Sequence, residues 1–349
     1  MARTARLDEY PGRLHISRWD LDKTYLRTDF DTVRDLVRTA FERADEKRTN
    51  PGAATLLREM ARAGVSIHIL SGSPEQMRRR LEDKLRLDGI RWDTFTLKPN
   101  LQNVLRLRFR ALRDQLGYKL PSLLASRATS SDTFTGVKET LFGDDAEADA
   151  FVYSLYADIM AGHVDSELVH AIFEKGRVYE DVMEKALDSI RNVVAEDVVE
   201  RILIHLERQT APRDFHVFGK RVVPFYNYLQ AAFVVHEDGR LPSEATLRVA
   251  AELVSLHRFD GDALARSYLD LARRGHLRGT RTDELEAALP AWLEEATPMT
   301  KPEVSAMVAR LGAYAAEASQ RWVPPKSEAM PDYLALVAAH NPRHKKRKS

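Results

Sequence analysis

The feature that most constrains the fold is an alternation of short apolar runs with amphipathic stretches between about Leu14 and Gly162. Three runs, Leu14–Trp19, Val65–Leu70 and Glu139–Phe142, are each followed by a turn rich in Asp, Ser or Gly. Between the first two, Gly52–Arg62 has the i, i+3, i+4 spacing of a helix with one apolar face. Strand, helix and strand in this order predict a parallel sheet, whose ligand crevice lies at the carboxyl ends of its strands.

Residues after about Asp165 show a different pattern, because strand-like runs become rare and helical spacing dominates. In Asp197–Arg208, three apolar residues (Val198, Ile202 and Leu206) share one helical stripe. Further helices are expected at Ser243–His257, Ala263–Arg273 and Lys301–Ala316. The sequence therefore predicts a Rossmann-like α/β domain at residues 1–164, an all-helical region at 165–338 and a basic, disordered tail at 339–349.

The composition narrows the class of protein. A chain of 349 residues with 44% apolar and 30% charged residues is typical of a soluble globular protein, and its length suggests two domains. Lys and Arg (53) nearly balance Asp and Glu (52), so bulk charge predicts neither nucleic-acid nor membrane binding. The chain has no cysteine, which excludes disulfides, thiolate metal sites and cysteine nucleophiles.

The two termini and the apolar segments of the sequence indicate where in the cell the protein is expected. Met1–Leu14 has no apolar core of signal-peptide length, and no window reaches the roughly 18 apolar residues of a spanning helix. We therefore expect a cytoplasmic protein without a transmembrane segment. Asn341–Ser349 is expected to be a solvated terminus; contact with nucleic acid or with an anionic membrane surface is the alternative.

Asp20 and Asp22 stand two residues apart, directly after the first expected strand. One carboxylate can attack phosphorus while the other acts as acid and base on the leaving group and then on water. Because two adjacent carboxylates repel each other, a bound cation would keep the nucleophile ionised. Taken alone, the pair also fits a helix cap or a turn.

Two further turns follow the other expected strands. Ser71-Gly72-Ser73-Pro74-Glu75-Gln76 suits the start of a helix, with Ser73 as the N-cap, and its free amides and the Ser71 hydroxyl can hold phosphate oxygens. Gly143-Asp144-Asp145-Ala146-Glu147-Ala148-Asp149 supplies the oxygen ligands that a hard divalent cation needs. Each turn alone also fits an ordinary junction between a strand and a helix.

Together, the segments D-x-D-x-T, the serine turn and G-D-x-x-x-x-D resemble the haloacid-dehalogenase-like superfamily over roughly residues 14–162. Within it, the sequence is most similar to the catalytic domain of the actin-patch-associated phosphatidate phosphatases. The similar segments are Ser71-Gly72-Ser73-Pro74, Phe142-Gly143-Asp144-Asp145 leading into Phe151–Tyr156, and the intervening strand-like Gly89–Leu97.

The resemblance implies a role for each matching residue. Asp20 is the expected nucleophile, which forms an aspartyl-phosphate and binds Mg²⁺, and Asp22 is the general acid/base, its backbone carbonyl on the metal. Thr24 supports the first loop. The expected phosphate-binding set is Thr24, Ser71, Gly72 and Lys119. The expected metal ligands are Asp20, Asp22, Asp144, Asp145 and Asp149, where Asp145 or Asp149 assists through water or pairs with the lysine.

The superfamily places a lysine near the phosphoryl group. Lys119 is the first candidate because it opens an apolar stretch before the acidic turn, and Lys98 and Lys138 are the competitors. Two features depart from the phosphatidate phosphatases, namely Lys23 directly before Thr24 and the lengthened segment Pro121–Lys138. Both departures weigh against the lipid substrate more than against phosphoryl chemistry.

The leading hypothesis is a Mg²⁺-dependent phosphomonoester hydrolase with a small-molecule or lipid phosphate as substrate. The first alternative is a non-catalytic scaffold or regulator whose helical half binds a partner. A third hypothesis is phosphoryl transfer to an acceptor other than water. These three hypotheses differ in whether Mg²⁺ binds and in what attacks the aspartyl-phosphate.

Overall fold

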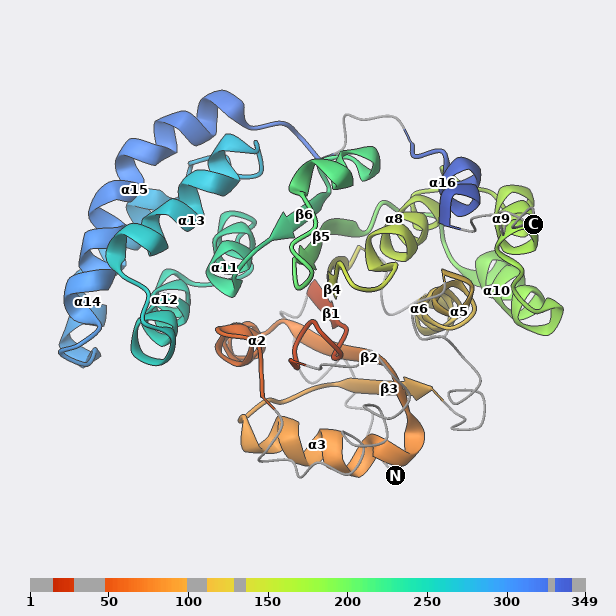
Figure 1. The fold of residues 1–349 in the computed structure, drawn as a ribbon, viewed down its shortest axis with the longest axis horizontal. Coiled ribbons are helices and arrows are strands. Elements are labelled where there is room, and N and C mark those ends of the chain that lie inside the picture. The colour runs from red at the N-terminus through yellow and green to blue at the C-terminus, as the bar shows by residue number, and fades with distance from the viewer. Residues whose placement is uncertain (1–14, 28–47, 99–111, 129–135, 326–329, 341–349) are drawn as a thin grey trace, which may run out of the picture.

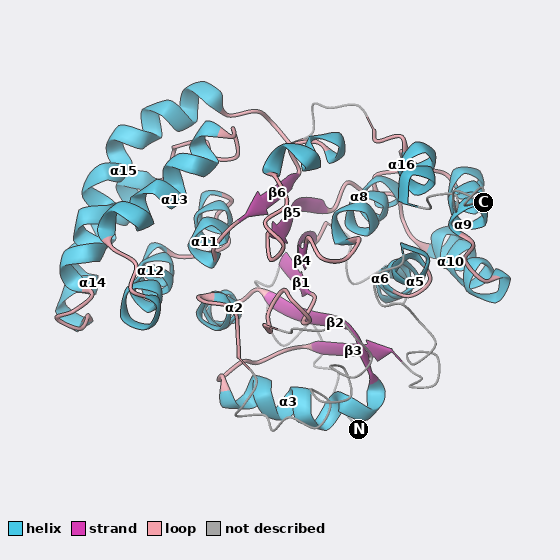
Figure 2. Cartoon of the chain, in the orientation of Figure 1, coloured by secondary structure: helices cyan, strands magenta, loops and turns pink. Residues whose placement is uncertain are grey.

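The computed structural model describes residues 15–27, 48–98, 112–128, 136–325 and 330–340. In these ranges the chain forms a Rossmann-like α/β fold, in which helices flank a six-stranded parallel sheet of order β3-β2-β1-β4-β5-β6 (Figures 1 and 2). The strands are β1 (His15–Trp19), β2 (Ser66–Pro74), β3 (Thr94–Lys98), β4 (Lys138–Asp144), β5 (Val199–His205) and β6 (Val222–Phe225). The expectation of a parallel sheet with flanking helices is confirmed.

Apolar side chains cover both faces of the sheet, as is typical of parallel sheets. On one face Trp19 of β1 stacks on Phe142 of β4, with ring centroids 3.8 Å apart. On this side lie α2 (Ala53–Arg62), α3 (Arg78–Leu87), α11 (Tyr228–Glu237), α12 (Ser243–His257), α13 (Gly261–Arg273), α14 (Thr282–Glu295) and α15 (Lys301–Arg321).

On the other face Leu141 of β4 and Ile202 of β5 belong to a second apolar core. This core is completed by α5 (Leu112–Leu116), α6 (Lys119–Ala128), α8 (Asp149–Met160), α9 (Ser166–Gly176), α10 (Glu180–Asn192) and α16 (Tyr333–His340). Two short 3₁₀ turns, η2 (Glu75–Met77) and η3 (Pro212–Phe218), follow β2 and β5.

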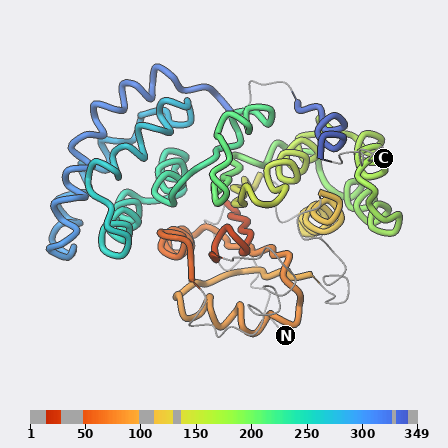
Figure 3. The backbone as a smooth tube through the Cα atoms, viewed as in Figure 1, coloured from red at the N-terminus to blue at the C-terminus, as the bar shows by residue number. Residues whose placement is uncertain are grey.

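The path of the chain creates one point at which the strand order reverses. The chain runs from β1 outward to β2 and β3, then returns to place β4 on the other side of β1 (Figure 3). The carboxyl ends of β1 and β4 therefore flank a topological switch point, which is where open α/β sheets bind their ligands.

Several expected helices are confirmed. Gly52–Arg62 contains α2, and the helices expected at 243–257, 263–273 and 301–316 correspond to α12, α13 and α15. The four begin within two residues of their expected starts, and α15 runs on to Arg321. Where the apolar spacing is long and regular, the sequence determines the helix well.

The prediction of a helix at Asp197–Arg208 is wrong, because Val199–His205 forms strand β5 between β4 and β6. Val199, Ile202, Leu203 and Ile204 are all at most 1% exposed, so the strand is apolar on both faces. A short continuous apolar run does not distinguish a buried strand from a buried helix by its spacing, and the β-branched residues favour the strand. The expected all-helical region at residues 165–338 therefore contributes β5 and β6 to the sheet, which crosses the boundary expected after residue 164.

From Tyr228 onward the described elements are all helices. The tail expected at residues 339–349 begins inside α16, which ends at His340, and residues 341–349 lie outside the described ranges. Residues 1–14, and 129–135 of the lengthened segment, also lie outside them. Among the helices of the described residues, none combines the length and apolar character that crossing a bilayer requires.

Candidate functional site

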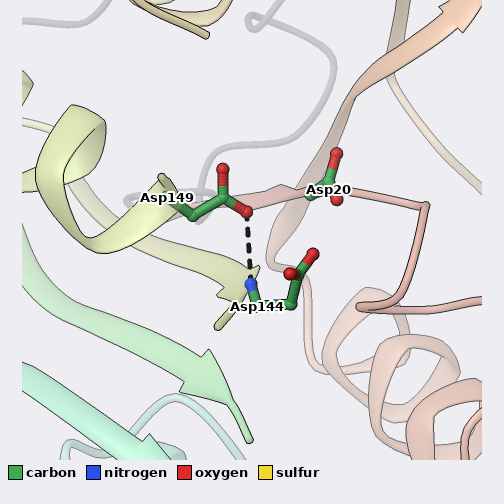
Figure 4. A group of neighbouring side chains, drawn as sticks. All are labelled: Asp20, Asp144 and Asp149. Carbon is green, nitrogen blue, oxygen red and sulfur yellow. Dashed lines mark hydrogen bonds between the residues drawn. The ribbon is translucent and has the colours of Figure 1, made fainter. Parts of the chain in front are cut away.

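Three buried carboxylates meet at the switch point of the sheet. Asp20 directly follows β1, Asp144 ends β4 and Asp149 begins α8 (Figure 4). One oxygen from each lies within 4.8 Å of the others. All three residues are at most 1% exposed. Burial of like charges at this separation is costly unless a positive charge offsets it.

The turn after β4 fixes two of these carboxylates. Asp144 Oδ1 accepts the backbone N–H groups of Ala146 (2.6 Å) and Glu147 (3.0 Å). The Asp144 N–H donates to Asp149 Oδ2 at 3.2 Å, the bond drawn in Figure 4. A Cβ on Gly143 would lie 2.5 Å from that same Asp149 oxygen. Glycine is therefore needed at position 143 for Asp149 to reach the cluster.

Lys119 supplies a positive charge to the cluster from the first residue of α6. Its Nζ lies 2.5 Å from Asp149 Oδ1, 3.0 Å from Glu147 Oε2 and 3.3 Å from Asp20 Oδ1, and the residue is fully buried. The two competing lysines lie elsewhere: Lys98 Nζ is 5.7 Å from the centre of the Tyr118 ring, and Lys138 Nζ donates to the Asp197 carbonyl at 2.5 Å. Of these three lysines, Lys119 is the one in contact with the cluster.

One lysine does not balance the carboxylates. Burial raises the pKa values of Asp20, Asp144 and Asp149, and repulsion from neighbouring carboxylates raises them further. The positive charge of Lys119 lowers them in part. Burial by itself would lower the pKa of Lys119, but Asp149, Asp20 and Glu147 raise it well above its usual value. The lysine therefore stays charged, and a bound cation would favour the ionised form of the carboxylates, which burial and mutual repulsion disfavour.

The donor set suits a hard divalent cation. Asp20 Oδ1 is buried and accepts no hydrogen bond from a described residue, with Lys119 as its ion-pair partner at 3.3 Å. Carboxylate oxygens are the ligands that Mg²⁺ takes in proteins, together with water. Asp20, Asp144 and Asp149 are the described residues that could hold it.

Asp22 lies in a second group, formed with the end of β2. Its Oδ2 accepts hydrogen bonds from the Ser71 hydroxyl at 3.0 Å and from the Ser73 hydroxyl at 2.8 Å. Ser73 is therefore not the N-cap that the sequence suggests, because β2 continues to Pro74 and the following turn begins at Glu75. A Cβ on Gly72 would meet nothing within 4 Å, so the backbone between the two serines borders open space.

Hydrogen bonds at Thr24 fix the position of the loop after β1. Thr24 Oγ1 lies 3.4 Å from both Asp20 Oδ2 and Asp144 Oδ2, and so bridges two members of the cluster. The Thr24 carbonyl accepts from Asn50 Nδ2 (2.7 Å) and from the Tyr228 hydroxyl (2.5 Å). Lys23 has φ of 63°, a left-handed conformation that is strained for a residue with a side chain. These contacts stabilise the strained loop that presents Asp20.

Asp145 makes contacts of another kind. Its two oxygens accept the backbone N–H groups of Arg208 (2.7 Å) and Thr210 (3.0 Å), which fastens the loop after β5 to the turn after β4. The structure thus brings Asp20, Asp144, Asp149, Lys119 and Thr24 together, and it places Asp22 with Ser71 and Asp145 with the neighbouring loop.

Three residues at the site are not among the site residues that the sequence predicts. Glu147 contacts Lys119, and Asn50 and Tyr228 hold the Thr24 carbonyl. Glu147 lies inside the acidic turn, so its charge was the available signal. Asn50 and Tyr228 lie far from the motifs along the chain, and only the fold brings them to the loop.

Comparisons with family models, with curated proteins and with solved structures find no match to this chain.

Proposed function

We propose that this chain is a Mg²⁺-dependent phosphomonoester hydrolase of the haloacid-dehalogenase-like type, in which Asp20 is the nucleophile. The observation that carries the proposal is the convergence of Asp20, Asp144 and Asp149 beside buried Lys119. This group lies at the switch point of a parallel sheet, where ligand sites form. A nucleophile, a cation-binding set and a fixed positive charge are the parts that phosphoryl transfer needs.

The metal would be held by Asp20, Asp144 and Asp149. Mg²⁺ bound there offsets the negative charge that builds on the phosphoryl oxygens during transfer. Lys119 adds a positive charge next to the nucleophile, and its contacts with Asp149 and Glu147 fix its position. Ser71 and the backbone at Gly72 border the space beside Asp22 and are the proposed contacts for phosphoryl oxygens.

The residues carry out the reaction in two steps. A carboxylate oxygen of Asp20 attacks phosphorus, which forms an aspartyl-phosphate and breaks the bond between phosphorus and the ester oxygen. Asp22 gives its carboxyl proton to that ester oxygen, so the leaving group departs as an alcohol. Water then attacks the phosphorus, Asp22 takes a proton from this water, and Asp20 leaves as a carboxylate.

The test is phosphate release by purified protein with Mg²⁺ from 4-nitrophenyl phosphate and from a panel of phosphomonoesters. We expect turnover by the wild type and a loss of at least about a thousandfold in Asp20→Asn, because the nucleophile is removed. Asp145→Asn is the matched control, since its carboxylate binds the loop after β5 instead of the cluster. Equal rates for wild type and Asp20→Asn on every phosphate would overturn the proposal.

Two outcomes would favour the alternatives. A chain that neither binds Mg²⁺ nor releases phosphate would favour a scaffold whose helical half binds a partner. Phosphate that appears on an added alcohol instead of in solution would indicate transfer to an acceptor other than water. The resemblance to phosphatidate phosphatases makes a lipid phosphate the first candidate substrate in the panel.

A further inference from the structure

Two serine hydroxyls converge on a single carboxylate oxygen at the end of β2. Ser71 Oγ and Ser73 Oγ lie 3.0 Å and 2.8 Å from Asp22 Oδ2, and both donate to it. Both serines are buried, at 0% and 3% exposed. Residues two apart along a strand share a face, and here the pairing with β3 also shifts between Ser71 and Pro74. The local backbone therefore supplies a pair of donors to one acceptor.

A count of protons shows that Ser71 cannot serve two acceptors. A serine hydroxyl has one hydrogen to donate. The Ser71 hydroxyl donates this hydrogen to Asp22, and its Oγ accepts a hydrogen bond from the Ser73 backbone N–H at 3.0 Å. If Ser71 donates to a phosphoryl oxygen, it must release Asp22. The Ser73 hydroxyl is then the donor of this pair that remains on Asp22.

The register of the sheet indicates which serine faces the phosphoryl group. Trp19 pairs with Ile69, so Asp20 is level with the stretch just before Ser71. Ser73 lies two residues further along, a distance of up to about 7 Å in an extended strand. Ser71 is therefore the hydroxyl nearer to the nucleophile, and Ser73 is the outer one.

We propose that Ser73 is a positioning residue, which holds the Asp22 carboxyl in place while the Ser71 hydroxyl turns from Asp22 to the phosphoryl group. This inference rests on the proposed function, and it assigns separate tasks to the two serines. Ser71 contributes to substrate binding. Ser73 keeps the acid/base group aligned with the leaving oxygen and with the attacking water.

The test is a set of serine variants assayed with 4-nitrophenyl phosphate and Mg²⁺. Ser73→Ala should lower kcat by about 10- to 100-fold with KM changed by less than about twofold, because a misplaced acid/base group slows the chemical step alone. Ser71→Ala should raise KM. Ser73→Thr keeps the hydroxyl and should recover most of the rate. Ser66→Ala is the matched control, a buried serine at the other end of β2 that donates to Asp93.

A double variant distinguishes a positioning role of Ser73 from a general disturbance of the active-site structure. If Ser73 acts through Asp22, then adding Ser73→Ala to Asp22→Asn should cause no further loss of kcat. Losses that multiply, an unchanged kcat in Ser73→Ala, or a rise in KM equal to that of Ser71→Ala would each overturn the proposal. Equal thermal unfolding of the serine variants and wild type checks that the fold is intact.

The outcomes also distinguish this inference from the proposed function. If wild type and Asp20→Asn are equally inactive on all phosphates, the proposed function fails and the positioning role fails with it. If the wild type shows turnover that depends on Asp20 while Ser73→Ala keeps the wild-type kcat, the positioning role alone fails. A crystal structure with inorganic phosphate should show Ser71 bonded to phosphate and Ser73 still bonded to Asp22; Ser71 retained on Asp22 would contradict the proposal.

Discussion

Two buried groups of charged residues on β1 and β4 differ in how their charge is balanced. Near the start of β4, Glu139 accepts Arg18 through both oxygens (2.7 and 2.9 Å), as well as Arg127 Nη1 (3.1 Å) and the Tyr156 hydroxyl (3.0 Å). At the end of the same strand, Asp144 lies with two other carboxylates and one lysine. Glu139 and Asp144 are five positions apart along the strand, a distance of roughly 17 Å.

The pKa values of the two groups shift in opposite directions. Burial alone would raise the pKa of Glu139, but Arg18 and Arg127 hold it below its usual value. Burial raises the pKa of Asp144 well above its usual value, and Asp149 and Glu147 raise it further. The first group is complete within the chain. The second has three carboxylates beside one lysine and could hold a cation, whereas the first has no such need.

Removing the carboxylate of the complete group should have the largest effect on stability. Glu139→Gln leaves buried Arg18 without its carboxylate partner and leaves Arg127 with Glu196 at 3.6 Å, so we expect a loss of about 3–5 kcal/mol in the free energy of unfolding. Urea denaturation should give the same loss in EDTA and in Mg²⁺. Glu200→Gln, which affects a partly exposed pair with Arg240, is the control and should cost less than about 1 kcal/mol. Equal losses in the two variants would show that the Glu139 network contributes little.

The histidine beside this network should make stability fall in acid. Burial, with a contribution from Arg240, lowers the pKa of His15 to about 3. In the unfolded chain the pKa is about 6.5, so between these values the unfolded state takes up a proton that the folded state does not. Stability is complete above pH 6.5 and falls as the pH is lowered, by about 2 kcal/mol at pH 5.

Denaturation at pH 8 and pH 5 checks this expectation. His15→Gln should lose less stability than wild type between the two pH values, because the titrating group is gone. The same slope in both proteins would contradict the lowered pKa of His15. The raised pKa values of the aspartate cluster have the opposite effect on stability. Protonation of these carboxylates on acidification relieves repulsion in the folded state and so stabilises it.

Neutralising one carboxylate of the incomplete group should have a smaller and opposite effect. Asp144→Asn keeps the Oδ1 acceptor for the Ala146 and Glu147 amides but removes a repelling charge. At pH 8 in EDTA we expect the variant to be more stable than wild type by about 1 kcal/mol. Saturating Mg²⁺ should reverse the order, because it binds and stabilises only the protein with the full site. A variant less stable than wild type under both conditions would contradict the account.

Much of the site could be predicted because its residues follow strands with clear sequence signals. β1, β2 and β4 are apolar runs that end in Asp, Ser or Gly, and parallel strands bring their carboxyl ends to one edge of the sheet. This places Asp20, Ser71 and Asp144 near one another before any coordinates are known. The long amphipathic helices of the second half were predictable from their spacing for a similar reason.

The remainder depends on geometry that spacing does not encode. β5 is a short run that is apolar on both faces, so the spacing of its apolar residues does not distinguish a helix from a strand. The choice between Asp145 and Asp149 depends on the direction in which each side chain leaves the turn, and Gly143 makes room for Asp149. The sequence suggests Ser73 as an N-cap. However, strand β2 continues to Pro74, and the Ser73 hydroxyl donates to Asp22. Asn50 and Tyr228 reach the loop only through tertiary contacts.

The central claim is that Asp20, Asp144 and Asp149 form a site that a divalent cation completes. Titration calorimetry with Mg²⁺ tests it most directly, on wild type, Asp144→Asn and Asp145→Asn at pH 8. We expect saturable binding of one ion to wild type and to Asp145→Asn, and no binding to Asp144→Asn. Of Asp144 and Asp145, Asp144 is the one that contributes an oxygen to the cluster. Absence of binding to wild type, or equal binding to Asp144→Asn, would contradict the account.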